Sequence, residues 1–281
     1  MSTRNVLCSL LCSLLCAPIL GACGENRTLP GPRPYAPGAE PRFECLPNLD
    51  GVLEAGELPI AVGETVGYLV GQNRPVGLEG TVDDEGRRRW DLATDYADDR
   101  IVRVGPTRLS DAWFGPDFPG ADYAAPVDVD GRVLGAYHLD ERGLWLHGVA
   151  SSEPSPPEGR TLLRYDAPVL LFALPIEPGR RWTSTGTISA GTALGLAYRG
   201  EDTYEVEVVG AGRLDLPDWS FGQAFRLDQQ VTVTPAIGEP ARRRITSWLF
   251  ECFGEVARAE SALGVTAPFE EAAELRRITL R

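Results

Sequence analysis

Short segments in which apolar and polar residues alternate recur along most of the chain, with turn signals between them. Strict alternation occurs in Y-E-V-E-V (204–208) and Q-V-T-V-T (230–234), and R-I-V-R-V (100–104) stops at Gly105-Pro106. Alternation with a period of two places one face of a strand in a core and the other face in water. Closely spaced turn signals are typical of antiparallel connections. The chain is therefore predicted to be mainly β, with an antiparallel sheet.

Helix is expected at one place only. Residues 268–277, P-F-E-E-A-A-E-L-R-R, carry proline in the first turn, acidic residues early and arginine late, as a short C-terminal helix would. Further strands are expected at 64–70, 87–93, 132–139, 144–149, 169–174, 203–209, 224–234 and 244–250.

Two β regions, 43–152 and 161–281, flank the proline-rich segment E-P-S-P-P-E-G (153–159). This segment is interpreted either as a hinge between two β subdomains or as a loop within one continuous domain. The sequence leaves both arrangements open.

The charge balance narrows the classes of partner. The chain has 27 basic residues, all of them arginine, against 40 acidic ones, for a net charge of −13. Binding of nucleic acid needs a basic face, so no nucleic-acid partner is expected. The absence of lysine excludes a P-loop, a Schiff base and an S-x-x-K nucleophile.

The start of the chain resembles the signal peptide of bacterial lipoproteins. Val6 to Leu20 is an apolar run that is too short for a membrane span and fits the core of a signal peptide. It ends in Leu20-Gly21-Ala22-Cys23, which is similar to a lipobox. The resemblance implies that residues 1–22 are removed and that Cys23 carries the lipid. An ordinary secretory signal, or an uncleaved apolar start, is the alternative.

Residues 23–42 are interpreted as a Pro/Gly-rich tether between this lipid and the folded part. The expected partner is a lipid membrane, reached through the acylated Cys23. Gly24 replaces the aspartate that favours retention in the inner membrane, so an outer-membrane location is expected if the source is Gram-negative.

The number of cysteines left after processing allows one disulfide. Cys8, Cys12 and Cys16 leave with the signal peptide and Cys23 is acylated, so one pair remains in an oxidising compartment. A disulfide between Cys45 and Cys252 is therefore predicted.

The segment from about 161 onwards has a recognisable order of motifs. It contains P-G-R-R-W (178–182), L-P-x-x-x-F-G-x-A-F (216–225) and W-L-F-x-C-F-G-E-V (248–256). This order resembles the C-terminal β module of secreted bacterial lipoproteins with curved sheets of the lipoprotein-carrier or lipocalin-like sort. The resemblance implies a curved antiparallel sheet, as a half-barrel or a sandwich, and carries no catalytic motif.

Residues 46–57 resemble the later part of an EF-hand calcium loop. Asn48 and Asp50 occupy ligand positions, a glycine follows for the sharp bend, and Glu57 stands where the closing carboxylate belongs. Leu46 replaces the usual first aspartate, and Pro59 ends the following helix. The segment is therefore either a weak calcium site formed by Asn48, Asp50 and Glu57, or a rigid turn held by Cys45.

The chain has two histidines, His138 and His147, on strands joined by a short turn. A type I turn with Gly143 in a left-handed bulge would place His138 opposite Leu146. The two imidazoles would then point to opposite faces of the sheet, which argues against a shared metal ion. A loop one residue different would bring them together.

No sequence feature indicates an enzyme directly. The chain contains no G-x-S-x-G, H-E-x-x-H, C-x-x-C or G-x-G-x-x-G motif. Carboxylates near tryptophans are the one arrangement that suits a hydrolase of glycans. They lie in a single stretch: Asp83, Asp84, Asp95, Asp98, Asp99 and Asp111, with Trp90 and Trp113.

The sequence is therefore interpreted as a lipid-anchored envelope protein with a non-enzymatic binding or structural module. An apolar ligand is the most concrete expectation, because curved sheets enclose cavities. The alternatives are a calcium-stiffened adhesion or scaffold module and an envelope hydrolase that uses paired carboxylates. Five aromatic residues are expected at the core or groove: Trp182, Trp219, Phe221, Phe225 and Trp248.

Overall fold

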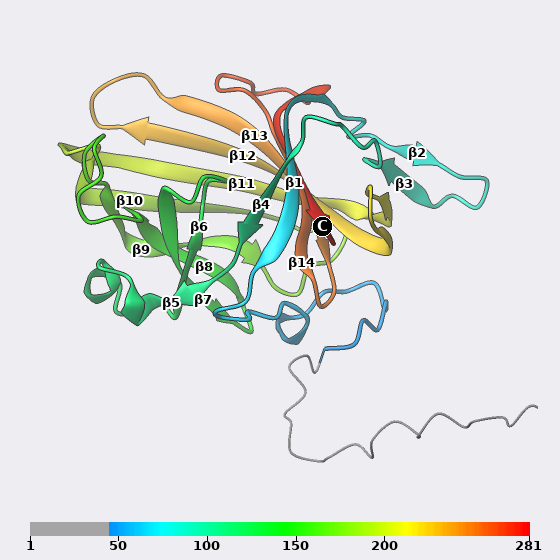
Figure 1. Ribbon diagram of the computed structural model, residues 1–281, viewed down its shortest axis with the longest axis horizontal. Helices are drawn as coiled ribbons and strands as arrows, with labels where there is room; N and C mark the ends of the chain where they lie inside the picture. Colours follow the sequence, from blue (N-terminus) through cyan, green and yellow to red (C-terminus); the bar gives the residue numbers. More distant parts are fainter. Residues whose placement is uncertain (1–44) are drawn as a thin grey trace, which may run out of the picture. The chain divides into compact units, whose positions relative to one another are not determined.

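One curved antiparallel sheet dominates the computed structural model, which describes residues 45–281 (Figure 1). The described residues form one compact unit. The mainly β, antiparallel prediction is confirmed. The signal peptide (1–22), Cys23 and the tether (23–42) lie outside the described residues and stay predictions.

The sheet contains fifteen strands, and most neighbours in the sheet are also neighbours in the sequence. The strands are β1 (Val66–Pro75), β2 (Thr81–Val82), β3 (Arg88–Asp91), β4 (Arg100–Val104), β5 (Thr107–Arg108), β6 (Tyr123–Pro126), β7 (Val133–Asp140), β8 (Gly143–Ser151), β9 (Leu162–Ala173), β10 (Arg181–Ala193), β11 (Leu196–Asp215), β12 (Ser220–Pro235), β13 (Ala241–Phe250), β14 (Gly254–Glu260) and β15 (Glu271–Thr279). Three single-turn 3₁₀ helices interrupt them: η1 (Ala55–Glu57), η2 (Leu109–Asp111) and η3 (Gly115–Asp117).

The strand order is β4-β1-β15-β14-β13-β12-β11-β10-β9-β8-β7-β6-β5. The small hairpin of β2 and β3 joins at the side, where β3 pairs in parallel with the end of β11. Strand β8 pairs directly with β9, so the loop around 153–159 connects neighbouring strands of the same sheet.

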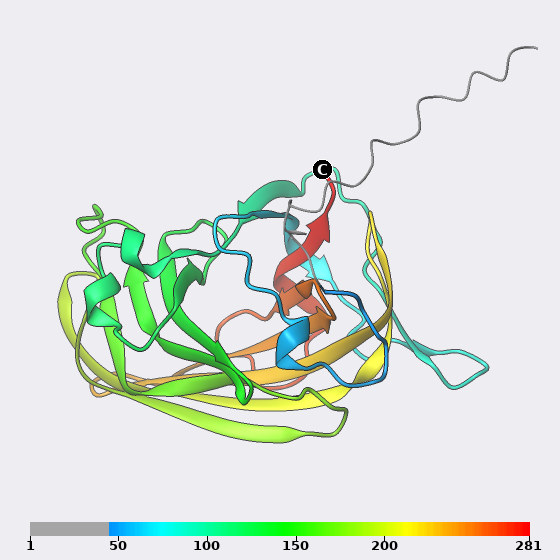
Figure 2. The ribbon, with the colours of Figure 1, turned by 90° about the horizontal axis from the view of Figure 1, so that it is seen from below.

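The two ends of this strand order are joined by two residues. Strand β4 lies at one edge and β5 at the other, and only Gly105 and Pro106 stand between them. A link of this length spans about 11 Å at most. The sheet must therefore curl until its edges come close. Figure 2 shows the result as a trough, with the yellow-green strands along its floor and the green strands facing the cyan and red ones across it.

The expected C-terminal helix at 268–277 is wrong. Most of that segment is β15, which pairs with β1 on one side and β14 on the other. The segment forms a strand because hydrogen bonding to strands on both sides and the burial of Leu275 and Ile278 stabilise it more than its small intrinsic preference for helix would.

The predicted disulfide between Cys45 and Cys252 is present, with the two Cα atoms 5.4 Å apart and 207 residues between them in sequence. Closing so long a loop removes conformational freedom from the unfolded chain, by about 5 kcal/mol in the chain-entropy account. The bond fastens the first described residue to the turn between β13 and β14.

The largest buried cluster is centred on Trp90 and Trp248, both fully buried, whose rings meet edge to face at 6.3 Å. Trp90 comes from β3, and its Nε1 donates to the carbonyl of Leu78. The packing of Trp90 against Trp248 of β13 holds the side hairpin against the central strands.

Gly105 in the link between the sheet edges has no room for a side chain. A Cβ atom there would lie 2.0 Å from the backbone oxygen of Glu64. We expect Gly105→Ala to lower the free energy of unfolding by about 1–3 kcal/mol, the usual cost of overpacking. Denaturant unfolding measures this change.

Gly210→Ala is the matched control for this prediction. Gly210 lies in β11, and a Cβ atom there would meet nothing within 4 Å. The two alanine variants should therefore differ clearly. Equal stabilities would show that the link has room for a side chain at Gly105, contrary to this prediction.

Candidate functional site

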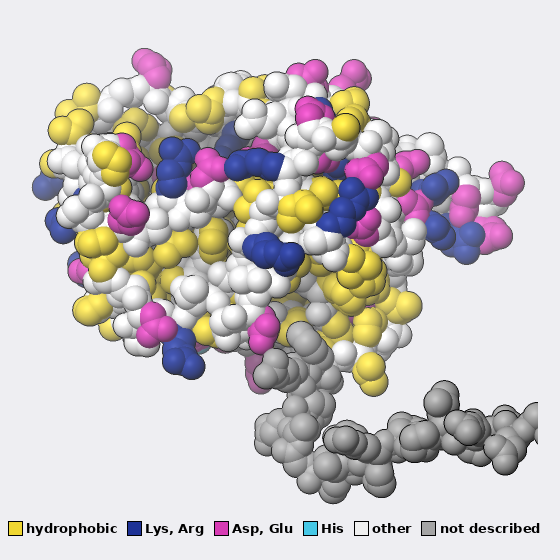
Figure 3. Space-filling view, in the orientation of Figure 1, with side chains coloured by type: hydrophobic (Ala, Val, Ile, Leu, Met, Phe, Trp, Pro, Cys, Tyr) yellow, Lys and Arg dark blue, Asp and Glu magenta, His cyan; other side chains and the backbone are white. Residues whose placement is uncertain are grey.

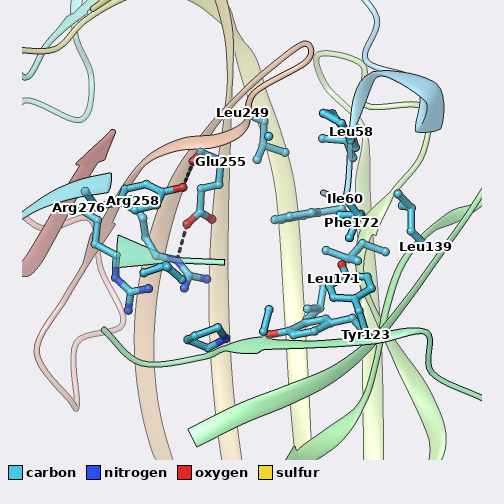
Figure 4. A pocket seen from close by; sticks show the side chains of 18 residues that line it. Leu58, Ile60, Tyr123, Leu139, Leu171, Phe172, Leu249, Glu255, Arg258 and Arg276 are labelled. Carbon is cyan, nitrogen blue, oxygen red and sulfur yellow. Dashed lines mark hydrogen bonds and ion pairs between the residues drawn. The ribbon is translucent and has the colours of Figure 1, made fainter. Parts of the chain in front are cut away.

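The curl of the sheet encloses a cavity of about 240 Å³ (Figure 4). Its walls come from strands near both ends of the strand order, so it lies inside the trough. The lining residues are Leu58, Pro59, Ile60, Tyr68, Val104, Tyr123, Ala125, Pro126, Tyr137, Leu139, Leu144, Leu171, Phe172, Leu249, Gly254, Glu255, Arg258 and Arg276.

Most of the cavity wall is apolar. Leu171 and Phe172 of β9 face the cavity together with Leu139 of β7 and Leu249 of β13 (Figure 4). The segment after η1 adds Leu58, Pro59 and Ile60. On the face shown in Figure 3, hydrophobic side chains gather beneath a band of charged ones. A surface of this kind favours ligands that can leave water.

One end of the cavity is charged. Glu255 and Arg258 of β14 and Arg276 of β15 line it, and Figure 4 shows Glu255 beside Arg258. The Arg258 side chain is 20% exposed and its Nε lies 3.4 Å from Oε1 of Glu255. Among the lining side chains the two arginines outnumber the one carboxylate, which leaves one positive charge facing the cavity.

The charged end belongs to a network on β13, β14 and β15. Arg258 stands opposite Arg276 in the ladder, and Glu260 stands opposite Glu274. Like charges directly opposite each other are unfavourable. Ion pairs along and across the strands offset this repulsion. Arg276 Nε binds Glu274 at 2.6 Å, and Arg243 binds Glu260 at 3.0 Å.

Burial and neighbouring charges shift the ionisation of these groups. Burial disfavours the charged form of Glu260, but Arg258, Arg243 and Arg276 outweigh it and hold its pKa below the usual range. Burial also opposes the charge of Arg258. The carboxylates of Glu255 and Glu260 overcome this effect and hold the pKa of Arg258 above its usual value.

The hydrogen bonds of Arg258 are incomplete. Its two carboxylate contacts are ion pairs, at 3.4 Å to Glu255 and 3.4 Å to Glu260. Its Nε is buried and has no hydrogen-bond partner within residues 45–281. A buried donor without a partner costs free energy. Because Arg258 forms ion pairs but no hydrogen bond within these residues, the terminal nitrogens of its guanidinium also remain for a ligand.

Three tyrosines complete the wall. Tyr68 donates its hydroxyl to the backbone oxygen of Glu255 at 2.7 Å. Tyr123 and Tyr137 stack on each other with ring centroids 5.5 Å apart. Burial raises the pKa of Tyr137 to about 12, although the charge of Arg258 acts in the opposite direction. The hydroxyls of Tyr123 and Tyr137 therefore stay protonated near neutral pH.

The predicted calcium ligands lie away from this cavity. The side-chain oxygen of Asn48 accepts the N–H of Asp50, and that of Asp50 accepts the N–H of Val52. Glu57 accepts the N–H of Glu54. These bonds are the ones expected of a rigid turn.

Partial burial raises the pKa of Glu57, and the negative charges of Glu251 and Asp50 raise it further. The hydrogen bond from the N–H of Glu54 acts in the opposite direction. Within the described residues no group of His, Cys, Asp or Glu side chains is arranged to hold a metal ion. The calcium hypothesis stays a prediction.

The predicted separation of the two histidines is wrong. The turn between β7 and β8 contains two residues, so Asp140 pairs with Gly143 and His138 with Trp145. Because side chains alternate along a strand, His147 lies on the same face as Trp145 and His138, and the two rings lie 6.4 Å apart. His138 Nδ1 bonds to Asp122 at 2.7 Å.

Four of the six aspartates in the acidic stretch pair with arginine. Asp98 and Asp99 bind Arg74 at 2.6 and 2.8 Å, and Asp99 also forms a fully buried ion pair with Arg277. Asp83 and Asp95 pair with Arg87 and Arg281. The tryptophans of this stretch are held through their ring N–H groups, which donate to backbone carbonyls.

The sequence patterns did not indicate which residues line the cavity. Of the five aromatic residues expected at the core or groove, three are buried in the core, namely Phe221, Phe225 and Trp248, and none of the five lines the cavity. A signal for its charged end existed in R-x-E (258–260) and E-x-R (274–276), whose spacing of two places opposite charges on one face of a strand.

Comparisons with protein-family models, curated proteins and solved structures found no match for this chain. Among residues 45–281, no helix has the length and apolar character to cross a membrane.

The low pKa of Glu260 predicts a pH-dependent stability. A carboxyl group whose pKa is depressed on folding stabilises the protein above its unfolded pKa, and this contribution is lost as the pH falls through the folded value. We expect Glu260→Gln to lower the free energy of unfolding by about 3 kcal/mol near neutral pH. The difference from the wild type should shrink below about pH 4. Denaturant unfolding at a series of pH values measures it.

Glu158→Gln is the control for this measurement, because Glu158 is exposed and lies in the loop between β8 and β9. Its effect should be small at every pH. A deficit for Glu260→Gln that does not change with pH would contradict the depressed pKa.

Proposed function

We propose that residues 45–281 form a non-enzymatic module that binds a small apolar molecule in the cavity inside the curled sheet. The supporting observation is a cavity with a mostly apolar wall and a few convergent polar groups at one end. This combination is typical of ligand sites, in which apolar contact supplies affinity and polar groups set orientation. We further propose that the chain is exported and held at a membrane by acylated Cys23, in accord with the lipobox.

The size of the cavity limits the ligand. Ligand pockets usually measure about 300–1,000 Å³. At about 240 Å³ the cavity lies just below this range, so it suits a single chain or a small ring system. A phospholipid with two acyl chains does not fit inside it.

Filling the cavity should prevent binding. Ala125 of β6 lines the cavity and is partly buried. We expect Ala125→Phe to weaken binding of the neutral fluorophore phenylnaphthylamine by about tenfold or more, which corresponds to the loss of about 1.4 kcal/mol of contact. Fluorescence titration of the purified protein measures it, and thermal unfolding confirms that the variant is folded.

Ala262→Phe is the matched control, because Ala262 is exposed in the loop after β14 and does not line the cavity. It should bind the fluorophore as the wild type does. The proposal fails if the wild type binds no fluorophore, or if Ala125→Phe binds it equally well.

The membrane anchor has a separate test. In a bacterium that processes lipoproteins, we expect Cys23→Ser to remove incorporation of labelled palmitate and to release the protein from the membrane fraction, because the thiol is the site of acylation. Cys45 and Cys252 bind each other and cannot replace it. A Cys23→Ser variant that still carries palmitate would exclude this anchor.

A further inference from the structure

The hydrogen-bond acceptors at the polar end of the cavity are already occupied. Glu260 receives Arg243 at one oxygen and Arg258 and Arg276 at the other. Glu255 accepts the hydroxyl of Ser247 at 2.9 Å through Oε2 and faces Arg258 through Oε1. The carboxylates of this network are therefore already engaged.

A donor remains free at the same place. The buried Nε of Arg258 has no hydrogen-bond partner within residues 45–281, and both carboxylates near the guanidinium stay at ion-pair distance. Arg276 differs, since its Nε is bound to Glu274 at 2.6 Å and one of its terminal nitrogens reaches the carbonyl of Val127 at 3.4 Å. Of the two arginines that line the cavity, Arg258 is the one that forms ion pairs but no hydrogen bond within the described residues, and so has the most donors left for a ligand.

The charges that face the cavity call for an anion. Arg258, Arg276 and Glu255 sum to one positive charge, while Glu260 and Glu274 do not line the cavity. One carboxylate would balance this charge. A carboxylate also matches the planar fork of a guanidinium, and hydrogen bonds between charged groups are about twice as strong as neutral ones.

The apolar wall stands across the cavity from this end. Figure 4 shows Leu171, Phe172 and Tyr123 on the side away from Glu255 and Arg258. A ligand that fits both ends has a carboxylate at one end and an apolar body at the other.

We propose that the ligand is a single-chain apolar carboxylate whose head is bound by Arg258, an inference that rests on the proposed binding function. The apolar body lies against Leu171 and Phe172, and the head accepts the free donors of the guanidinium. A neutral amphiphile of the same length makes the apolar contacts but leaves Arg258 without a charged partner.

The experiment compares decanoate with decanol and methyl decanoate, by displacement of phenylnaphthylamine from the full-length mature protein. We expect the wild type to bind decanoate about tenfold to a hundredfold more tightly than decanol, the range expected for a charge-assisted bond. In Arg258→Gln the ratio should fall to about one, and Arg258→Lys, which keeps the charge without the fork, should give an intermediate ratio.

Arg276→Gln is the control variant, since it removes the same charge from the same cavity. We expect it to keep more of the preference for decanoate than Arg258→Gln does, because Nε and one terminal nitrogen of Arg276 already form hydrogen bonds, whereas Arg258 forms none within residues 45–281. The ratio is taken within each variant, so a general loss of stability cancels. Equal loss of the ratio in both glutamine variants would overturn the assignment to Arg258.

The outcomes separate the two proposals. If the wild type binds decanoate and decanol equally well, the cavity binds apolar ligands and the carboxylate inference is wrong. If the fluorophore itself does not bind, so that neither compound can displace it, the proposed binding function fails. A preference for methyl decanoate over decanoate would also contradict the inference, because Glu255 would then repel the charged head.

Discussion

The short link between β4 and β5 is the constraint on which the rest of the structure depends. These strands end the sheet on opposite sides, yet Gly105 and Pro106 alone connect them. A flat sheet of this width cannot satisfy the link, so the sheet curls and its two halves face each other. An ion pair between Arg100 and Asp130, at 2.8 Å, links β4 to the loop after β6 across the two halves. The cavity follows from this closure, because its walls belong to strands that a flat sheet would keep far apart.

The curl also explains why so much charge is buried. Strands β14 and β15 turn arginine and glutamate side chains into the trough, where these side chains are largely buried, and Arg258 lies opposite Arg276. Such an arrangement is stable only when each charge has a partner, since an unpaired buried ion costs several kcal/mol. Glu260 supplies that partner for three arginines. The same face therefore combines a structural need for charge pairing with one arginine that is incompletely bonded, and that residue opens onto the cavity.

Local patterns predicted the elements but not how the sheet closes. Alternating segments gave most strands, and the curved sheet and the disulfide between Cys45 and Cys252 were predictable from the sequence. The segment 268–277 was misjudged because its helix propensity is local, whereas pairing with β1 and β14 depends on residues far away in the chain. The turn after Asp140 shows the same limit, because one residue of register moved His147 to the face of His138. The lining of the cavity could not be predicted, since it comes from many separate segments and no single one carries a recognisable motif.

The segment from Cys45 to Ile60 connects the proposed anchor to the proposed site. It is fixed at three points: the disulfide to Cys252, the bonds from Asn48 and Leu49 to the buried carboxylate of Glu251, and the two backbone bonds between Leu53 and Ile176. Beyond these points it supplies Leu58, Pro59 and Ile60 to the cavity wall. The disulfide therefore does more than stabilise the sheet, since it also holds the segment that closes one side of the cavity. The proposed tether precedes Cys45 in the chain, so this fixed segment stands between the proposed anchor and the wall of the cavity.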